Sequence, residues 1–356
     1  MRIGIDAREI VGQATGVGRY LSGLLTEWAA SGAASRHEFF LYAHAPMPSA
    51  PPRFTARVVP GSSGTWWQQA ALPAATRADN LDVFFAPQYT APLALRIPTV
   101  LVVYDVSFAA HPEWFRTREG MRLRTLSRTA ARRARAVVTI SEFSRREIAW
   151  HLGVPDARIH VIPPGIPARG LASPAPRSGE RGRLLYVGSI FNRRHVPDLI
   201  RAFAPVARAH PDASLDVVGD NRSYPYEDIT AVMDREDLGA RIRWHRYATD
   251  DDLNTLYSSA RAFAFLSEYE GLGLTPLEAL SAGVPPILYD TEIARESCGD
   301  AALYVRPGNA GDVSRAIERL LFDEAAHDSL LAGASSTLAR YSWRRAARET
   351  LALIER

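Results

Sequence analysis

One stretch, residues 261–290, constrains the fold of this chain more than any other. It opens with a short apolar run at 262–266, typical of a buried strand, and closes with a second one at 284–289. Between them lie a loop at 267–274 that contains two glycines and a segment that carries helix signals. A strand–loop–helix–strand unit belongs to a parallel sheet covered by helices, so we expect an α/β protein.

The helix of this unit is predicted to begin at Thr275. Threonine can cap a helix, Pro276 suits the first helical position, and Glu278 stands three residues after the cap, which completes a capping box. Gly283, with Pro285 just beyond it, predicts the end of the helix in the left-handed conformation.

A ligand with phosphate groups is expected at the start of this helix. Ligands of such sheets bind at the carboxyl ends of the strands, where glycine allows close approach and a helix N-terminus attracts anions. The two flanking glutamates, Glu270 and Glu278, are strong acceptors for the hydroxyls of a sugar or a ribose. Together these features indicate a nucleotide sugar.

The letters EGLGLTPLEALSAGVPPI, residues 270–287, resemble the glutamate-pair signature of the retaining glycosyltransferases of family 4. The resemblance implies the GT-B fold, in which two Rossmann-like, doubly wound α/β domains face each other across a cleft and a C-terminal helix crosses back to the N-terminal domain. It also implies that Glu270 contacts the donor sugar and takes part in catalysis, and that Glu278 contacts the ribose. Leu272 replaces the usual phenylalanine. The implied donor-binding residues of this stretch are Glu270, Gly271, Leu272, Gly273, Leu274, Thr275 and Glu278.

The length of 356 residues suits two domains. Proline and glycine are dense around 161–182, which is typical of a linker between domains. We expect an acceptor-binding domain at 1–165, a linker at 166–182, a nucleotide-sugar-binding domain at 183–340 and a terminal helix at 341–356.

In the first domain, TGVGRY follows a predicted strand at 2–6 and precedes a predicted helix from Arg19. Gly16 and Gly18 either form a flexible turn or let the backbone approach the donor phosphate or the acceptor. The family resemblance favours the second reading and adds Arg19 as an acceptor-binding candidate.

A buried strand at 99–104 leads to Tyr104 and Asp105, both acceptor-side candidates. Relatives carry histidine where this chain has Tyr104, and a tyrosine with a reference pKa of ~10 is a poor base. Asp105 is either a hydroxyl acceptor for the incoming sugar, and then a catalytic candidate, or the cap of the next segment.

In the second domain, Arg193 and Arg194 follow the strand at 184–188. They match the basic pair that grips the donor diphosphate in the family, which makes both donor-binding candidates and Arg193 a catalytic one. The alternative is two surface arginines at a helix start. Tyr247 ends a predicted strand at 241–247, and the family resemblance makes it a candidate for contact with the base, because in relatives the loop after this strand contacts the base.

Residues 116–146 contain ten arginines against two glutamates. Three interpretations stay open: a solvated helix face, docking on an anionic membrane, and nucleic-acid binding, which would require interleaved aromatic residues. Because those aromatics are missing until Phe143, no nucleic-acid partner is expected. All 42 basic residues of the chain are arginine, which suits phosphate binding by a nucleotide enzyme but is better explained by codon bias in a GC-rich genome.

Several classes of protein are excluded. No run reaches the ~18 apolar residues of a membrane span, and the single cysteine, Cys298, excludes an internal disulfide. The acidic cluster at 249–253 is interpreted as a capping box on Thr249, so no metal is expected. We expect a cytoplasmic protein, with contact to the inner face of the membrane as an option.

Within the family, GIDAR at 4–8 with TGVGRY, YDVSFAAHPEWF at 104–115 and the SEFS turn at Ser141–Ser144 resemble bacterial mannosyltransferases that build O-antigen or exopolysaccharide. The resemblance implies transfer of a hexose from a nucleoside diphosphate sugar, favoured as GDP-mannose, onto a glycan or lipid-linked saccharide, without a separate cofactor. Two alternatives remain: transfer from a UDP-sugar, and a non-catalytic subunit that only binds nucleotide sugar. The chain has no lysine, which excludes a phosphorylase with a lysine-linked cofactor.

Overall fold

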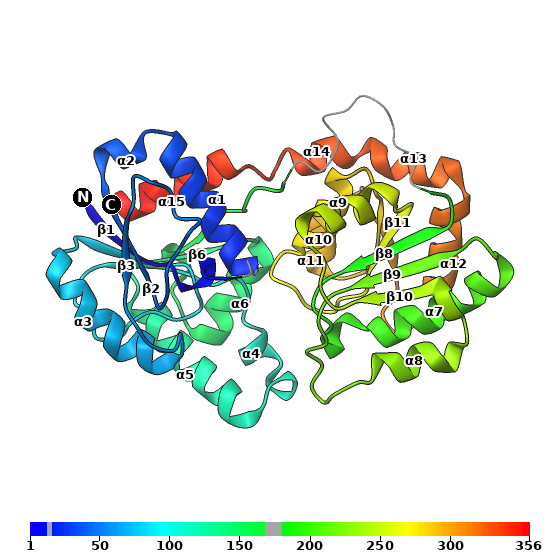
Figure 1. Cartoon of the computed structure of the whole chain (residues 1–356), viewed down its shortest axis with the longest axis horizontal. Coiled ribbons are helices and arrows are strands. Elements are labelled where there is room, and N and C mark those ends of the chain that lie inside the picture. The colour runs from blue at the N-terminus through cyan, green and yellow to red at the C-terminus, as the bar shows by residue number, and fades with distance from the viewer. Residues whose placement is uncertain (13–15, 168–179) are drawn as a thin grey trace. The chain divides into compact units, whose positions relative to one another are not determined.

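The computed structural model describes residues 1–12, 16–167 and 180–356. The chain divides into two compact units: unit 1 consists of Met1–Gly165 and Tyr341–Arg356, and unit 2 of Ile166–Arg340 (Figure 1). Most of the expected linker, at 168–179, lies outside the described residues. Within the described part of the chain, no helix is long and apolar enough to cross a membrane.

Unit 1 is built on a seven-stranded parallel sheet in the order β3-β2-β1-β4-β5-β6-β7. Its strands are β1 (Arg2–Asp6), β2 (Glu38–Ala43), β3 (Thr55–Val58), β4 (Val83–Ala86), β5 (Thr99–Val102), β6 (Ala136–Thr139) and β7 (Ile159–Val161). Its helices include α1 (Gly16–Ala30), α2 (Ala33–Arg36), α3 (Leu72–Thr76), α4 (Ser107–Ala110), α5 (Thr117–Arg133), α6 (Glu142–Leu152) and α15 (Trp343–Glu355). The three-residue strand β7 was not predicted, because so short a run carries no clear alternation.

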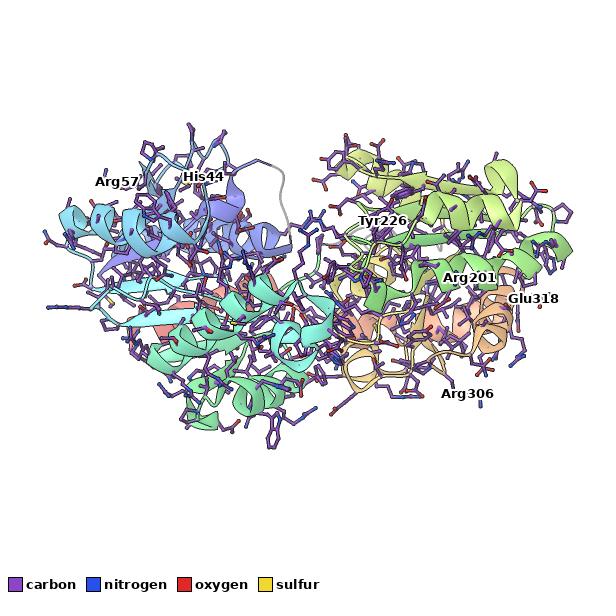
Figure 2. All side chains as sticks on the ribbon, turned by 90° about the horizontal axis from the view of Figure 1, so that it is seen from below. His44, Arg57, Arg201, Tyr226, Arg306 and Glu318 are labelled. Atoms are coloured by element: carbon purple, nitrogen blue, oxygen red, sulfur yellow. The ribbon has the colours of Figure 1, made fainter. Side chains whose placement is uncertain are left out.

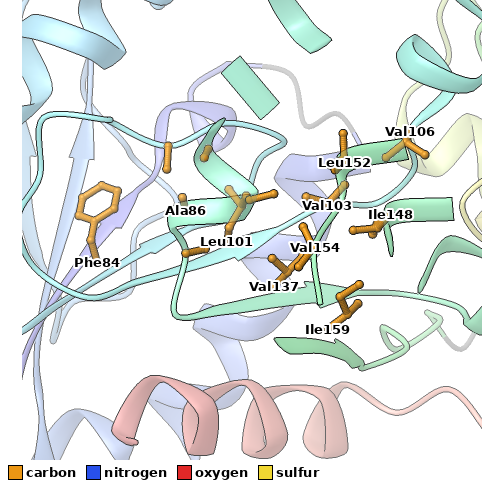
Figure 3. Close-up of a cluster of buried hydrophobic side chains, with 14 of the residues drawn as sticks. Phe84, Ala86, Leu101, Val103, Val106, Val137, Ile148, Leu152, Val154 and Ile159 are labelled. Atoms are coloured by element: carbon orange, nitrogen blue, oxygen red, sulfur yellow. The ribbon is translucent and has the colours of Figure 1, made fainter. Parts of the chain in front are cut away.

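The core of unit 1 forms where the buried strands meet the helices that cover them. Figure 3 shows Leu101 of β5 and Val137 of β6 beside Ile148 and Leu152 of α6, all of them buried. Strand β5 lies inside the sheet between β4 and β6, and its successive residues Val100, Leu101 and Val102, which point to alternate faces, are all fully buried. Both faces are therefore covered, as expected from the continuous apolar sequence.

The C-terminal helix α15 returns to unit 1, as the family resemblance implies. The indole Nε1 of Trp28 in α1 donates a hydrogen bond to the Ala347 carbonyl oxygen at 2.9 Å. A Cβ atom at Gly23 would lie 2.6 Å from the Trp343 ring, so glycine lets the two helices approach closely.

Unit 2 is built on a six-stranded parallel sheet in the order β10-β9-β8-β11-β12-β13. Its strands are β8 (Arg183–Val187), β9 (Ser214–Val218), β10 (Ile242–His245), β11 (Ala262–Phe265), β12 (Pro286–Tyr289) and β13 (Leu303–Val305). Its helices include α7 (Val196–Ala209), α8 (Ile229–Glu236), α9 (Asp250–Ser259), α10 (Leu274–Ser281), α11 (Glu292–Cys298), α12 (Ala310–Phe322), α13 (Glu324–Ala332) and α14 (Ala334–Leu338). From β8 the chain builds one side of the sheet through β9 and β10, and from β11 it builds the other. The carboxyl ends of β8 and β11 therefore form a topological switch point, where ligands of such sheets bind.

Two predicted helix starts are wrong. Helix α10 begins at Leu274, not at Thr275, and its N-cap is Gly273 with φ 82°, so no capping box forms on Thr275. Glycine adopts this left-handed conformation without strain, which lets the helix start one residue earlier. The end at Gly283, with φ 79°, is confirmed. Helix α1 already begins at Gly16, so Gly16 and Gly18 lie in a helix rather than in a loop.

Candidate functional site

A bidentate ion pair joins the two loops at the switch point of unit 2. Arg194 follows β8 and Glu270 follows β11. The guanidinium Nε of Arg194 lies 2.7 Å from Glu270 Oε1, and its Nη2 lies 3.1 Å from Oε2. The two side chains are only 15% and 16% exposed, so the pair is largely removed from water. The structure thus brings two of the predicted site residues into direct contact.

Further hydrogen bonds hold both partners of this pair. The Ser267 hydroxyl donates to Glu270 Oε1 at 2.9 Å, and Arg194 Nη1 donates to the Ser189 carbonyl oxygen at 2.9 Å. Burial raises the pKa of Glu270, but the charges of Arg194 and Arg193 and the hydrogen bonds outweigh it, so the net pKa is below the usual range. Glu270 is therefore ionised near neutral pH and acts only as a hydrogen-bond acceptor.

Arg193 lies at the same edge of the sheet. Its carbonyl oxygen accepts the Glu268 N–H at 3.0 Å, and its guanidinium lies 4.3 Å from the centre of the Phe191 ring. The turn that carries both arginines is thereby joined to the loop that carries Glu270. Two adjacent guanidinium groups at this edge are the kind of group that can bind a diphosphate.

The residues after Glu270 form the start of α10. Gly271 and Leu272 are buried, whereas Gly273, Leu274 and Thr275 are half-buried. Glu278 is only 3% exposed, and its Oε2 accepts a hydrogen bond from the Tyr257 hydroxyl at 3.5 Å. The second glutamate of the signature thus lies inside unit 2, while the first lies at its partly open edge.

In unit 1, the hydroxyl of Tyr104 is committed to the backbone. It donates to the Pro87 carbonyl oxygen at 2.8 Å, and the ring packs edge-on against Tyr20 and Tyr89. Burial, and then the neighbouring Tyr20, raise the pKa of Tyr104 well above its ordinary value. Tyr104 therefore cannot serve as a base near neutral pH.

Asp105 fixes the segment that follows it. Its Oδ1 accepts the N–H of Ser107, the first residue of α4, at 2.8 Å, and its Oδ2 accepts the Tyr89 hydroxyl at 3.1 Å. Asp105 therefore holds the turn that leads into α4 but is not its cap, because the N-cap residue is Val106. The acceptor role of Asp105 stays a prediction. Arg19 is half-buried in the first turn of α1, and Tyr247, after β10, is 62% exposed; their predicted roles also stay predictions.

His195 is a residue of this site that the sequence did not single out. It follows the arginine pair, and its ring lies between two carboxylates: Nδ1 is 3.0 Å from Asp198 Oδ2, and Nε2 is 2.9 Å from Glu268 Oε1. The signal that could have found it is the spacing of His195 and Asp198, three residues apart at a helix start.

Three arginines of the basic segment donate to carbonyl oxygens at the ends of helices. Arg128 and Arg132 of α5 donate to the His151 and Leu152 carbonyl oxygens at the end of α6, at 2.8 and 3.0 Å. Arg135 donates to two carbonyls near the end of α15. In unit 2, the capping box on Thr249 is confirmed, with Asp252 as its partner.

Comparison with known proteins finds two matching family models and similar glycosyltransferases. Residues 14–169 match the family described as Glycosyltransferase Family 4, and residues 173–335 match the family described as Glycosyl transferases group 1. The chain is 25% identical over 280 residues to the O-antigen chain mannosyltransferase B of Escherichia coli, which covers 76% of this chain and 73% of that protein.

Solved structures show the same fold. Sucrose-phosphate synthase from Thermosynechococcus elongatus superposes with a TM-score of 0.79 at 17% identity, over 100% of this chain and 98% of that one. Anabaena HepE in complex with UDP and glucose superposes with a TM-score of 0.75 at 18% identity, over 100% and 99%. The chain therefore belongs to the family 4 glycosyltransferases of the GT-B fold and is a nucleotide-sugar-dependent hexosyltransferase.

Proposed function

We propose that this enzyme transfers mannose from GDP-mannose, with retention at the anomeric carbon, onto a glycan or lipid-linked saccharide acceptor. The product would be a cell-surface polysaccharide such as O-antigen or an exopolysaccharide. The similarity to the O-antigen chain mannosyltransferase B supports the sugar and the class of acceptor. The observation that carries the proposal is the Arg194–Glu270 pair at the switch point of unit 2.

In this proposal the positive groups at the switch point stabilise the leaving group. As the bond between the sugar and the diphosphate breaks, negative charge grows on the diphosphate. Arg193, Arg194 and the N–H groups at the start of α10 would offset that charge, and they need no reorganisation to do so. Electrostatic stabilisation of this kind needs no separate cofactor.

Glu270 would orient the donor sugar by accepting hydrogen bonds from its hydroxyls. Its low pKa keeps both of its oxygens available as acceptors. When the donor binds, Arg194 exchanges part of its contact with Glu270 for the diphosphate, and Glu270 turns the released oxygen to the sugar. Glu278 is assigned to the ribose. Arg19 and Asp105 are assigned to the acceptor, and Tyr104 supports Asp105 by packing against Tyr89.

A panel of nucleotide sugars tests the donor. We expect hydrolysis or transfer with GDP-mannose, and activity with UDP-sugars alone would overturn the mannose assignment. Glu270→Ala should abolish transfer in a protein that keeps its circular dichroism spectrum, and wild-type turnover in that variant would refute the site. Donor binding without turnover, over several acceptors, would favour a non-catalytic subunit.

We further propose that unit 1 contacts the anionic inner face of the membrane from the cytoplasmic side. Arg116, Arg118 and Arg122 are exposed at the start of α5, and Met121 beside them is 55% exposed. Arg122 also donates to the Thr65 hydroxyl, which places the 73% exposed Trp66 near this helix. Basic residues together with exposed tryptophan favour the interface of an anionic bilayer.

Sedimentation with vesicles tests this contact. We expect binding to vesicles that contain phosphatidylglycerol and none to pure phosphatidylcholine. The double variant R118E/R122E should lose the binding. Equal binding to both vesicle types, or binding that survives the double variant, would refute this surface.

A further inference from the structure

His195 occupies an unusual position between the arginine pair and α7. Its backbone has φ 48°, in the left-handed region that most side chains avoid. In this conformation the ring lies edge-on to Tyr289 at a centroid distance of 5.4 Å. Nδ1 is hydrogen-bonded to Asp198, whereas Nε2 lies at ion-pair distance from Glu268 without hydrogen-bond geometry. The ring is 25% exposed, so it is mostly enclosed by these groups.

The surroundings of the ring favour the doubly protonated form. A neutral imidazole has one N–H and one lone pair, and the lone pair would then face a carboxylate oxygen at about 3 Å. The other charged or titratable groups nearby are Arg201, which donates to Asp198 Oδ1 at 2.7 Å, and Glu227, which interacts with the ring through its charge. The hydrogen bond to Asp198 raises the pKa of His195, and the Glu268 carboxylate adds to this against the effect of burial.

Three contacts tie the turn at 192–195 to the loop at 267–270. The Glu268 N–H donates to the Arg193 carbonyl oxygen, the His195 ring meets the Glu268 carboxylate, and Arg194 holds Glu270. The middle contact is the one that depends on the proton of a histidine, whose ordinary pKa of about 6.5 is raised here. We call His195, Asp198 and Glu268 the histidine clasp.

We propose that His195, as the imidazolium, is a positioning residue for the donor site. By holding Glu268 it fixes the loop in which Glu270 faces Arg194. Loss of the proton leaves Asp198 bonded and releases Glu268, so the loop that presents Glu270 gains freedom. The donor should then bind more weakly as the pH rises, while the chemical step changes less. The activity readout of this inference rests on the proposed function, whereas its structural readout does not.

The structural readout is the titration of His195 by NMR, with the signal assigned by its loss in His195→Asn. Asparagine also accepts the left-handed conformation, so this variant keeps the backbone. We expect the wild-type ring to titrate above the ordinary value of about 6.5, and its pKa to fall in Glu268→Gln. A ring that titrates at or below the ordinary value, or that is unaffected by Glu268→Gln, would overturn the inference.

The functional readout is the KM for the donor between pH 6 and 9. For wild type we expect it to rise about threefold as the ring loses its proton, with a smaller change in kcat, as suits a partly exposed ion pair. In His195→Asn and in Glu268→Gln the KM should be raised at all pH values and flat. A wild-type KM that does not change with pH, or a variant that keeps the wild-type rise, would contradict the positioning role.

The matched control lies at the other end of α7. His210 Nε2 is 2.9 Å from Glu318 Oε1, the same kind of contact far from the site in sequence, and His210→Asn should keep the wild-type pH profile. Figure 2 labels Glu318 of this control and Arg201 beside the clasp. If no donor is turned over, the proposed function fails, whereas the NMR titration still tests whether His195 and Glu268 interact in the histidine clasp.

Discussion

Neutralising Glu270 without changing its size is the sharpest test of the site. In Glu270→Gln one oxygen can still accept a hydrogen bond from Arg194, but the charge that balances the guanidinium is gone. Because both side chains are about 15% exposed, the cation is left where water cannot fully solvate it. Breaking a buried ion pair from one side costs about 3–5 kcal/mol, and the remaining exposure and hydrogen bond favour the lower end, about 3 kcal/mol.

This loss should appear as a lower melting temperature of unit 2. For a domain of this size, 1 kcal/mol corresponds to about 2–4 °C, so Glu270→Gln should lower the midpoint by about 6–12 °C in differential scanning calorimetry. Asp290→Asn is the matched control. Asp290 forms the same bidentate contact with Arg295, at 2.6 and 2.9 Å, but the partners are 42% and 55% exposed, so we expect no resolvable shift.

The pH dependence provides a second check on the same variant. The pKa of Glu270 is lowered in the folded protein, so its contribution is present above the unfolded pKa of about 4.3 and is lost as the pH falls. The difference between wild type and Glu270→Gln should therefore shrink in acid. Equal melting temperatures for the two proteins at pH 7, or a difference that grows in acid, would refute the buried pair.

Three further outcomes are expected. Tyr104→Phe removes the hydrogen bond to Pro87 and should cost about 1 kcal/mol with kcat kept, and a tenfold loss of kcat would return a chemical role to the hydroxyl. Gly23→Ala places a methyl group 2.6 Å from the Trp343 ring and should destabilise unit 1 by about 1–3 kcal/mol, with faster hydrogen exchange in α15, whereas Gly16→Ala at the open start of the same helix should not. Because the pKa of His195 is raised in the folded protein, the stabilisation from its contacts is complete below about pH 6.5 and is lost as the pH rises through the folded pKa. In heating scans, the gap in melting temperature between wild type and His195→Asn should therefore close in alkali. A gap that widens in alkali would contradict that sign.

The parts of the fold that local chemistry dictates could be predicted from the sequence. The apolar runs at 262–266 and 284–289 correspond to β11 and β12, and Gly283 ends the helix between them in the left-handed conformation. The start of that helix could not be predicted as well. Gly273 and Thr275 are both plausible caps, and only the path of the loop after Glu270 decides between them.

The central contact of the site could not be derived from spacing. Arg194 and Glu270 lie 76 residues apart, and β9, β10 and β11 lie between them along the chain. They meet because β8 and β11 are neighbours in the sheet. The family resemblance placed both residues at the donor, but the ion pair between them follows only from the strand order and the geometry of the two loops.

The basic segment shows why composition alone left three interpretations open. An arginine count does not separate charges that face a partner from charges that the fold itself uses. Here Arg128, Arg132 and Arg135 donate to carbonyls at the ends of α6 and α15, where the helix dipole is negative, so they act as caps. The exposed arginines at the start of α5 stand instead beside Met121 and near Trp66. Within the basic segment, the first turns of α5 combine exposed arginines with exposed apolar side chains. The proposed membrane contact is assigned to these turns because both kinds of side chain favour a bilayer interface.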